Sequence, residues 1–433
     1  MRYSGVVSAL RAPILIALAV TVSVLAPHSK AQIIQDGNFP AVVCPGALGG
    51  GTQQISLPAK GLGARSINGR SEIFKVQKST ILAGTLAPTF ISGNRGSEIA
   101  FQSISGSSSA DAVCQVGGVD QWFIGGSGGV TSQGILQIIN SGLSESLVQI
   151  FPYNSKGALA PIAITVKGNS LRNFSLASVV PGEDSVALHI VTDSGRVSTF
   201  LLDHRRNGLR DLGASFVTPV SAPATTSYIS GLLGSAAKAV STMRFLVPGN
   251  LSAHVHLSIY SNGGAITPIG FDSLLVARQR VLDVAIPPIV VAGTYGIEVT
   301  SDQPIFASTL TSFAGTDFSW ANQLTPLSSF NINLAGAHAQ FFFMGDAIAI
   351  RLQWVDSKGK PNNEIISGHS AALFRPQGAL NGVTFTTLTK SPIFGGMIVA
   401  NPNGGLNYLP LLANRLISRA RSPNSDLRTL ARQ

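Results

Sequence analysis

The most constraining feature of this chain is a pattern that occurs three times, at intervals of about 100 residues. In each copy a short apolar strand ends near a glycine, a strand of alternating apolar and polar residues follows, and a polar turn closes on a second glycine. Alternation places apolar side chains on one face, as a half-buried strand requires, and Asn, Asp and Gly suit hairpin turns. The second glycines of the three copies are Gly157, Gly264 and Gly359.

The period and the pattern predict an all-β chain of tandem immunoglobulin-like β-sandwich units. Solenoid repeats and propeller blades are shorter, at roughly 20–50 residues, whereas closely spaced short strands over about 100 residues are typical of a β-sandwich. No long stretch follows a helical period. We expect β-sandwich units at residues 121–222, 228–330 and 333–413, preceded by an irregular or partial β unit at 32–120.

The first 31 residues have the composition of an export signal. Arg2 and Arg11 precede an apolar run over residues 12–26. The small residues Ser29 and Ala31 then form a cleavage site. The run is shorter than the about 20 residues that span a membrane. We therefore expect residues 1–31 to be a signal peptide, with an N-terminal membrane anchor as the alternative, and the protein to be secreted or extracytoplasmic.

Cysteine usage agrees with export. Cys44 and Cys114 are the only two cysteines, and no Cys-x-x-Cys pair indicates zinc. In an oxidising compartment two such cysteines predict one disulfide. The bridge would close a long loop and, by lowering the entropy of the unfolded chain, would stabilise the fold by about 4 kcal/mol.

The net charge of +10 is concentrated at the two ends of the chain. Charged residues make up only 12% of the sequence, against about 25% in an average globular protein, and the body has no basic cluster of the kind that binds nucleic acid. Residues 414–433 form a predicted flexible basic tail that would bind acidic polymers electrostatically. Its arginines are Arg415, Arg419, Arg421, Arg428 and Arg432.

Four motifs suggest chemistry, but none is convincing. Residues Gly125–Gly129 match the Gly-x-Ser-x-Gly pattern of hydrolases, yet that mechanism needs a helix after the serine and the following residues predict a strand. Asp203–His204 would need a distant serine, and Arg205 and Arg206 directly after it predict a solvated loop. Glu183–Asp184 is placed in a turn, and His254 with His256 lacks a third metal ligand nearby. We therefore predict no catalytic residue, no metal site and no cofactor.

Three tryptophans are candidate ligand contacts. Trp122, Trp320 and Trp354 lie at or beside predicted strands. Packing in the core is the simplest role for such residues, whereas an exposed indole would stack on a sugar.

Part of the chain resembles an uncharacterised family of secreted actinobacterial proteins with a domain of unknown function. The similarity lies in Cys114, in the segment Trp122–Gly126 and in the strand Leu136–Asn140, and it extends over roughly residues 110–330. Asn140 is followed by Ser141 where the family has proline. The resemblance implies export and association with the cell envelope, and it assigns no site residue.

Together these observations predict an exported, non-enzymatic, cell-envelope-associated protein with a structural or interaction role. Its expected partner is an envelope glycan, an acidic polymer or an envelope protein. The alternative is an extracellular carbohydrate-binding protein or a glycan-active hydrolase, the latter requiring two converging carboxylates.

Overall fold

We describe the fold from a computed structural model, over residues 42–48, 51–57, 61–65, 72–76, 80–92, 99–105, 108–261, 264–287, 292–313, 317–327, 329–356, 358–400 and 405–412. Within these residues nearly all regular structure is β-strand; helix α2 (Leu176–Val179) has four residues, and a 3-10 turn covers Ser235–Ala237. The expected all-β chain of tandem β-sandwich units is confirmed. No helix in this part of the chain is long and apolar enough to cross a membrane.

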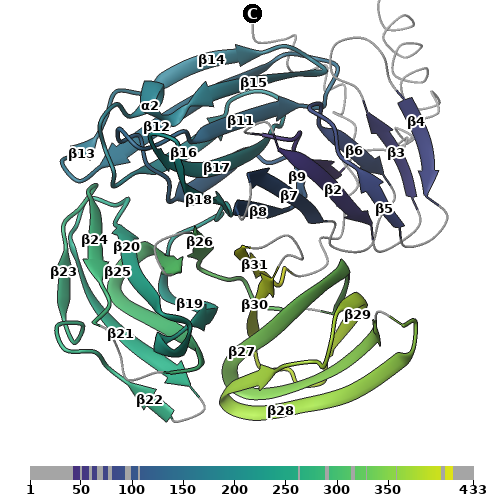
Figure 1. The fold of residues 1–433 in the computed structure, drawn as a ribbon. Coiled ribbons are helices and arrows are strands. Elements are labelled where there is room, and N and C mark those ends of the chain that lie inside the picture. The colour runs from purple at the N-terminus through teal and green to yellow at the C-terminus, as the bar shows by residue number, and fades with distance from the viewer. Residues whose placement is uncertain are drawn as a thin grey trace, which may run out of the picture. The chain divides into compact units, whose positions relative to one another are not determined.

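The first unit, residues 42–116, has two antiparallel sheets with the strand orders β4-β3-β6-β1-β9 and β5-β2-β7-β8 (Figure 1). Apolar residues of the two sheets, including Val42, Ile55 and Ile91, form one buried cluster. This segment, which we expected to be irregular or partial, therefore contributes two paired sheets. Its strands are β1 (Val42–Cys44), β2 (Thr52–Leu57), β3 (Gly61–Arg65), β4 (Glu72–Val76), β5 (Thr80–Ala83), β6 (Thr89–Ser92), β7 (Ile99–Ser105), β8 (Ser108–Val113) and β9 (Gln115–Val116).

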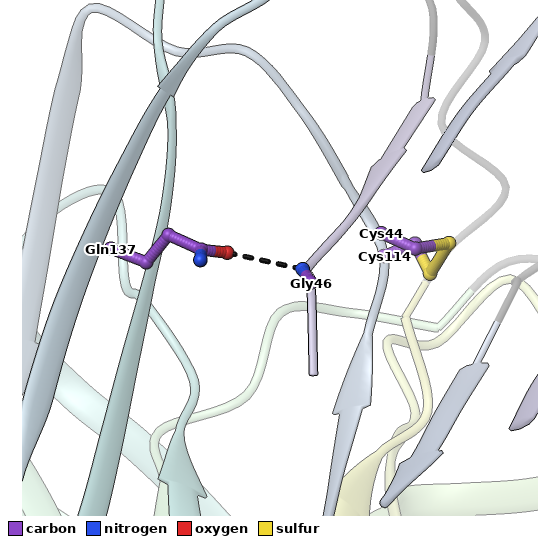
Figure 2. The surroundings of a disulfide bond; sticks show 4 residues. All are labelled: Cys44, Gly46, Cys114 and Gln137. Carbon is purple, nitrogen blue, oxygen red and sulfur yellow. Dashed lines mark hydrogen bonds between the residues drawn. A yellow bond between two sulfur atoms is a disulfide. The ribbon is translucent and has the colours of Figure 1, made fainter. Parts of the chain in front are cut away.

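The expected disulfide joins Cys44, at the end of β1, to Cys114, which follows β8 (Figure 2). The two Cα atoms are 4.4 Å apart, 70 residues separate the cysteines, and both side chains lie in the core of the first unit. Close to Cys44, the N–H of Gly46 donates to Oε1 of Gln137 at 3.2 Å (Figure 2). The disulfide therefore anchors a segment that also contacts the second unit.

The second unit, residues 120–217, pairs a sheet ordered β10-β16-β12-β13, with β14 also on β12, with a sheet ordered β15-β11-β17-β18. The alternating strand β12 buries Val148 and Ile150 against Leu136 and Ile138 of β11. Asn154 pairs with Gly157, as the turn chemistry predicts. The strands are β10 (Asp120–Ile124), β11 (Ile135–Asn140), β12 (Ser146–Asn154), β13 (Gly157–Ala158), β14 (Ile162–Val166), β15 (Ser170–Ser175), β16 (Ala187–Thr192), β17 (Ser198–Asn207) and β18 (Arg210–Val217).

The third unit, residues 224–322, is organised around the 20-residue strand β25. The first part of β25 pairs with β19 and β21, and its second part pairs with β20 and β26, so one strand belongs to both sheets. The strands are β19 (Ala224–Leu233), β20 (Ala239–Leu246), β21 (Ala253–Ser261), β22 (Gly264–Ile266), β23 (Leu274–Val276), β24 (Val281–Ala285), β25 (Thr294–Phe313) and β26 (Asp317–Asn322).

The fourth unit, residues 330–410, is organised around the 27-residue strand β27. The start and the end of β27 lie on opposite sides of β29, because Asn331 and Gln353 both pair with Thr384. The pairing with β28 shifts register after Gly345, whose φ of +152° favours glycine. The strands are β27 (Phe330–Asp356), β28 (Pro361–Phe374), β29 (Leu380–Thr387), β30 (Phe394–Ala400) and β31 (Leu406–Pro410).

The last long strands of the four units contact one another. Strand β8 of the first unit and β26 of the third unit each contact both β18 of the second unit and β31 of the fourth. Contacts therefore run from each unit to the next, and from the fourth back to the first. The cores follow the same path. Ala110 packs with Phe216 of the second unit, Trp320 enters the second unit's core, Tyr408 enters the third's, and Phe101 joins the fourth's. The units therefore share cores.

A glycine sets how closely the third and fourth units pack. A Cβ atom on Gly396 of β30 would lie 2.2 Å from the carbonyl oxygen of Ser230 on β19, so only glycine permits this approach. In the same region the hydroxyl of Ser230 donates to the carbonyl oxygen of Phe342 at 2.6 Å.

Candidate functional site

The three tryptophans occupy different surroundings. Trp122 is 8% exposed and its ring stacks on the imidazole of His189, with centroids 3.7 Å apart. Trp320 is 1% exposed. Trp354 is half-buried and meets the ring of Phe374 edge-on, with centroids 5.1 Å apart. Two indoles are thus unavailable for stacking on a sugar, and the third packs against the core of the fourth unit.

Asp203 is a buried carboxylate that links the second and third units. It accepts a hydrogen bond from Nε1 of Trp320 at 2.8 Å and from Nη2 of Arg205 at 2.8 Å. His204 lies 3.4 Å from a carboxylate oxygen of Asp211, and burial lowers the pKa of His204 although Asp211 acts in the opposite direction. The solvated loop expected at Asp203–His204 is therefore wrong: both residues are buried on strand β17, where Asp203 accepts hydrogen bonds from Arg205 and Trp320.

Arg244 on β20 is a central residue of this contact, and the sequence motifs considered above did not include it. Its side chain is 3% exposed, and Nε and Nη2 donate to the two carboxylate oxygens of Asp283 at 2.7 Å each. The guanidinium also lies 4.8 Å from the ring centroid of Trp320. A single charged residue in a strand whose other residues are uncharged is the sequence signal for such a buried arginine. The remaining acceptors are the carbonyl oxygens of Gly126, Val186 and Asp184, at 2.8, 3.0 and 3.0 Å.

The Gly-x-Ser-x-Gly segment is a loop between β10 and β11, and strand β11 follows it rather than a helix. The Oγ atom of Ser127 donates to Asp184 at 2.9 Å and accepts from the N–H of Gly129 at 3.1 Å. Glu183 forms an ion pair with Lys156 at 3.4 Å. The candidate nucleophile and both candidate carboxylates are thus engaged in contacts that hold neighbouring loops together.

His254 and His256 lie on β21, where the nearest partners of their imidazole rings are the hydroxyls of Ser273 and Ser258, each at 3.2 Å. In the part of the chain that the structure describes, no group of three or more His, Cys, Asp or Glu could hold a metal ion. The predicted signal segment and the five tail arginines lie outside the described residues.

A cavity of about 420 Å³ lies where the segments that connect the units converge. Residues from 115–121, 218–221 and 322–325 line it, together with Pro410 and Leu412. The Asn322 side chain is buried, and its Nδ2 donates to a carbonyl oxygen. Among the described residues its Oδ1 has no hydrogen-bond partner. The connecting segments therefore form a partly enclosed junction that is lined by both apolar and polar residues.

A second cavity, of about 470 Å³, is a groove across the strands of the fourth unit, which we call the transverse groove. Strand register places four polar residues side by side in one row on one face of the sheet, and this row forms one wall of the groove. The next row of residues on that face forms the other wall. Trp354 lies between the rows, and alternation turns its side chain toward the core. The polar wall consists of Asn331, Thr384, Gln353 and Asn363. The other wall contains Val355, which pairs with Pro361, and Gly382, which pairs with Asn333.

A family model described as a family of unknown function, DUF5719, matches residues 91–365. The match covers more than half of the chain. The chain belongs to the DUF5719 family. The matched segment includes Trp122, Arg244, Trp320 and Trp354, and it ends within β28, so it includes only part of the transverse groove.

No curated protein matches this DUF5719 chain. Among solved structures, one that aligns with it is a tetra-tandem repeat from the extending region of a large adhesion protein. The alignment covers 83% of this chain and 91% of that chain, at 11% identity and a TM-score of 0.12. At that score the similarity carries no argument about architecture or function.

In this DUF5719 protein, Asp317 on β26 lies where the second, third and fourth units meet. Its carboxylate accepts from the backbone N–H of Phe318 at 2.9 Å and from that of Leu406 at 3.1 Å. Burial raises the pKa of Asp317 to about 6, although these backbone hydrogen bonds act to lower it; the charge of Asp211 adds to the increase. The contact between the units therefore contains a carboxyl group that titrates near pH 6.

We expect Asp317 to make the fold less stable as pH rises. Its pKa in the folded protein is above the ordinary value of 3.8, so its contribution is fully present below pH 4 and is lost as pH rises through about 6. Between pH 5 and pH 8 this amounts to about 1.4 kcal/mol of unfolding free energy. Denaturant titrations of the wild type and of Asp317→Asn at both pH values should show this difference. The exposed Asp272→Asn should keep the wild-type change in unfolding free energy between the two pH values. The same change in Asp317→Asn would contradict the assignment.

Proposed function

We propose that this chain is an exported, non-enzymatic protein of the cell envelope with a structural or interaction role. The observation that carries the proposal is the set of shared cores, which joins four β-units into a scaffold that presents outer sheet faces and loops to a partner. The internal hydrogen bonds of Ser127, Glu183 and Asp184 support a role without catalysis. The disulfide and the predicted signal segment support an oxidising compartment.

The proposed partners are an envelope glycan, an acidic polymer or an envelope protein. An acidic polymer suits residues 414–433, which carry five arginines and one aspartate. Binding of that kind is electrostatic, and salt screens it.

A retention experiment tests the proposal. Residues 32–433 are incubated with isolated envelope fractions across a salt series, and the bound fraction is measured. We expect retention, with a salt-sensitive part that is lost when the five tail arginines are changed to glutamine. Changing the same five residues to lysine keeps the charge and should keep that part. Absence of retention on every fraction would contradict the proposed envelope role.

Carbohydrate binding is a second candidate function, and the transverse groove favours it. The groove offers neutral hydrogen-bonding groups on an accessible sheet face. Hydrolysis of a glycan receives less support, because it needs two carboxylates flanking the scissile bond and no ionisable residue is among the described residues that line this groove.

A further inference from the structure

The transverse groove has one wall of amide and hydroxyl groups. Asn331, Thr384, Gln353 and Asn363 lie side by side on four neighbouring strand segments, so the row spans roughly 14 Å at the usual strand spacing. Gln353 and Asn363 are exposed, and the other two are half-buried. Each amide side chain offers both a donor and an acceptor, and so does the threonine hydroxyl. This wall therefore matches a ligand whose groups also both donate and accept.

The opposite wall is apolar and contains an open position. Val355 and Pro361 are exposed there, and Val355 is 37% exposed. Gly382 lies in the same row, and a Cβ atom built on it would meet no atom within 4 Å. The groove thus combines a hydrogen-bonding side with an apolar side, and the glycine leaves space between the flanking residues.

The floor of the groove excludes recognition of a peptide by strand addition. That mode needs a free sheet edge whose N–H and C=O groups are unpaired, whereas β29 lies between two segments of β27, and the second of these pairs with β28 as well. Recognition along the floor must therefore come from side chains, because the free edge of the sheet at β28 lies at the end of the groove. Since no ionisable residue is among those that line the groove, a charged ligand would find no partner of opposite charge there.

We propose that the transverse groove binds a linear, uncharged oligosaccharide that lies across β29, β27 and β28. Hydroxyl groups of the sugar donate hydrogen bonds to the amide wall and accept hydrogen bonds from it. The C–H faces of the sugar rings contact Val355 and Pro361. The length of the row suits several linked rings rather than one. This inference rests on the second candidate function proposed above, carbohydrate binding, and it specifies the ligand class and the site.

The test uses the whole chain and uncharged linear hexasaccharides of β-1,4-linked glucose, α-1,4-linked glucose and α-1,6-linked mannose. Titration calorimetry of the wild type should detect binding of at least one of them, with an affinity that salt leaves unchanged. Gly382→Leu places a side chain in the open position and should lower the association constant at least tenfold. Gly249→Leu is the matched control, because a Cβ atom there also meets nothing within 4 Å.

A second pair of variants tests the polar wall. Gln353→Ala combined with Asn363→Ala should lower the association constant at least tenfold, whereas the exposed Gln133→Ala in the second unit should leave it unchanged. Absence of binding by all three hexasaccharides, or equal binding by Gly382→Leu, would overturn the proposal. Binding of an uncharged hexapeptide in their place would also overturn it.

The retention experiment separates this inference from the proposed function. If the chain is retained on envelope fractions but binds no hexasaccharide, the groove assignment fails and the envelope role stands. If a hexasaccharide binds in the groove but no fraction retains the chain, the envelope role fails and the groove assignment stands.

Discussion

Replacing Arg244 with methionine should lower the unfolding free energy by about 2–4 kcal/mol, because the carbonyl oxygens of the buried residues Gly126 and Val186 lose their hydrogen bonds from Arg244, and each such loss costs about 1–3 kcal/mol. Burial acts to raise the pKa of Asp283, but Arg244 and Ser185 together bring it below its ordinary value, so the carboxylate is charged at neutral pH. Without Arg244 three carbonyl oxygens lose a hydrogen bond, and among the described residues the Asp283 side chain, which is 27% exposed, keeps only the hydrogen bond from Ser185. Denaturant titration followed by tryptophan fluorescence measures the loss, since Arg244 lies over Trp320.

The matched control is Arg351→Met, at an exposed arginine on β27. Substitutions at exposed positions usually change the unfolding free energy by less than about 0.5 kcal/mol. A double-mutant cycle with Asp283→Asn should show coupling between the two residues. If Arg244→Met cost no more than Arg351→Met, Arg244 would not hold the second and third units together.

Removing the disulfide should destabilise the first unit by about 2–5 kcal/mol. In the variant Cys44→Ala/Cys114→Ala the unfolded chain gains the freedom of a long loop, because 70 residues separate the two cysteines. The loss should be concentrated in residues 42–116. Hydrogen exchange read by peptide mass should therefore show faster exchange there than in residues 224–322.

Chemical reduction supplies the control for this prediction. A reductant should lower the unfolding midpoint of the wild type and leave that of the double variant unchanged. An equal midpoint for the oxidised wild type and the double variant would show that the bridge contributes nothing to stability.

Local sequence patterns were sufficient for the repeated strands, their turns and the disulfide, but not for the two sheets of residues 42–116. Alternation in His254–Ile259 predicts a strand with one buried face, and β21 has that pattern. The turn residues predict the hairpin at Asn154–Gly157, which is present. Such features depend on residues close together in the chain, and two cysteines leave only one pairing.

The roles of the site residues depended on distant contacts. Alternation places Trp320 on one face of a strand, but the face becomes buried only because the second unit packs on it. Likewise, nothing local pairs Arg244 with loops at Gly126 and Val186. A single arginine in an otherwise uncharged strand indicates a partner without identifying it.

The sequence by itself determined an all-β chain of repeated units with one disulfide, because strand periodicity and turn chemistry are local properties. The tertiary structure alone decided that the units share cores, that two tryptophans are buried between them, and that Asn331, Gln353, Asn363 and Thr384 form one row. The physical reason is that register and packing between units depend on contacts between residues far apart in the chain, and those contacts leave no periodic signal in the sequence.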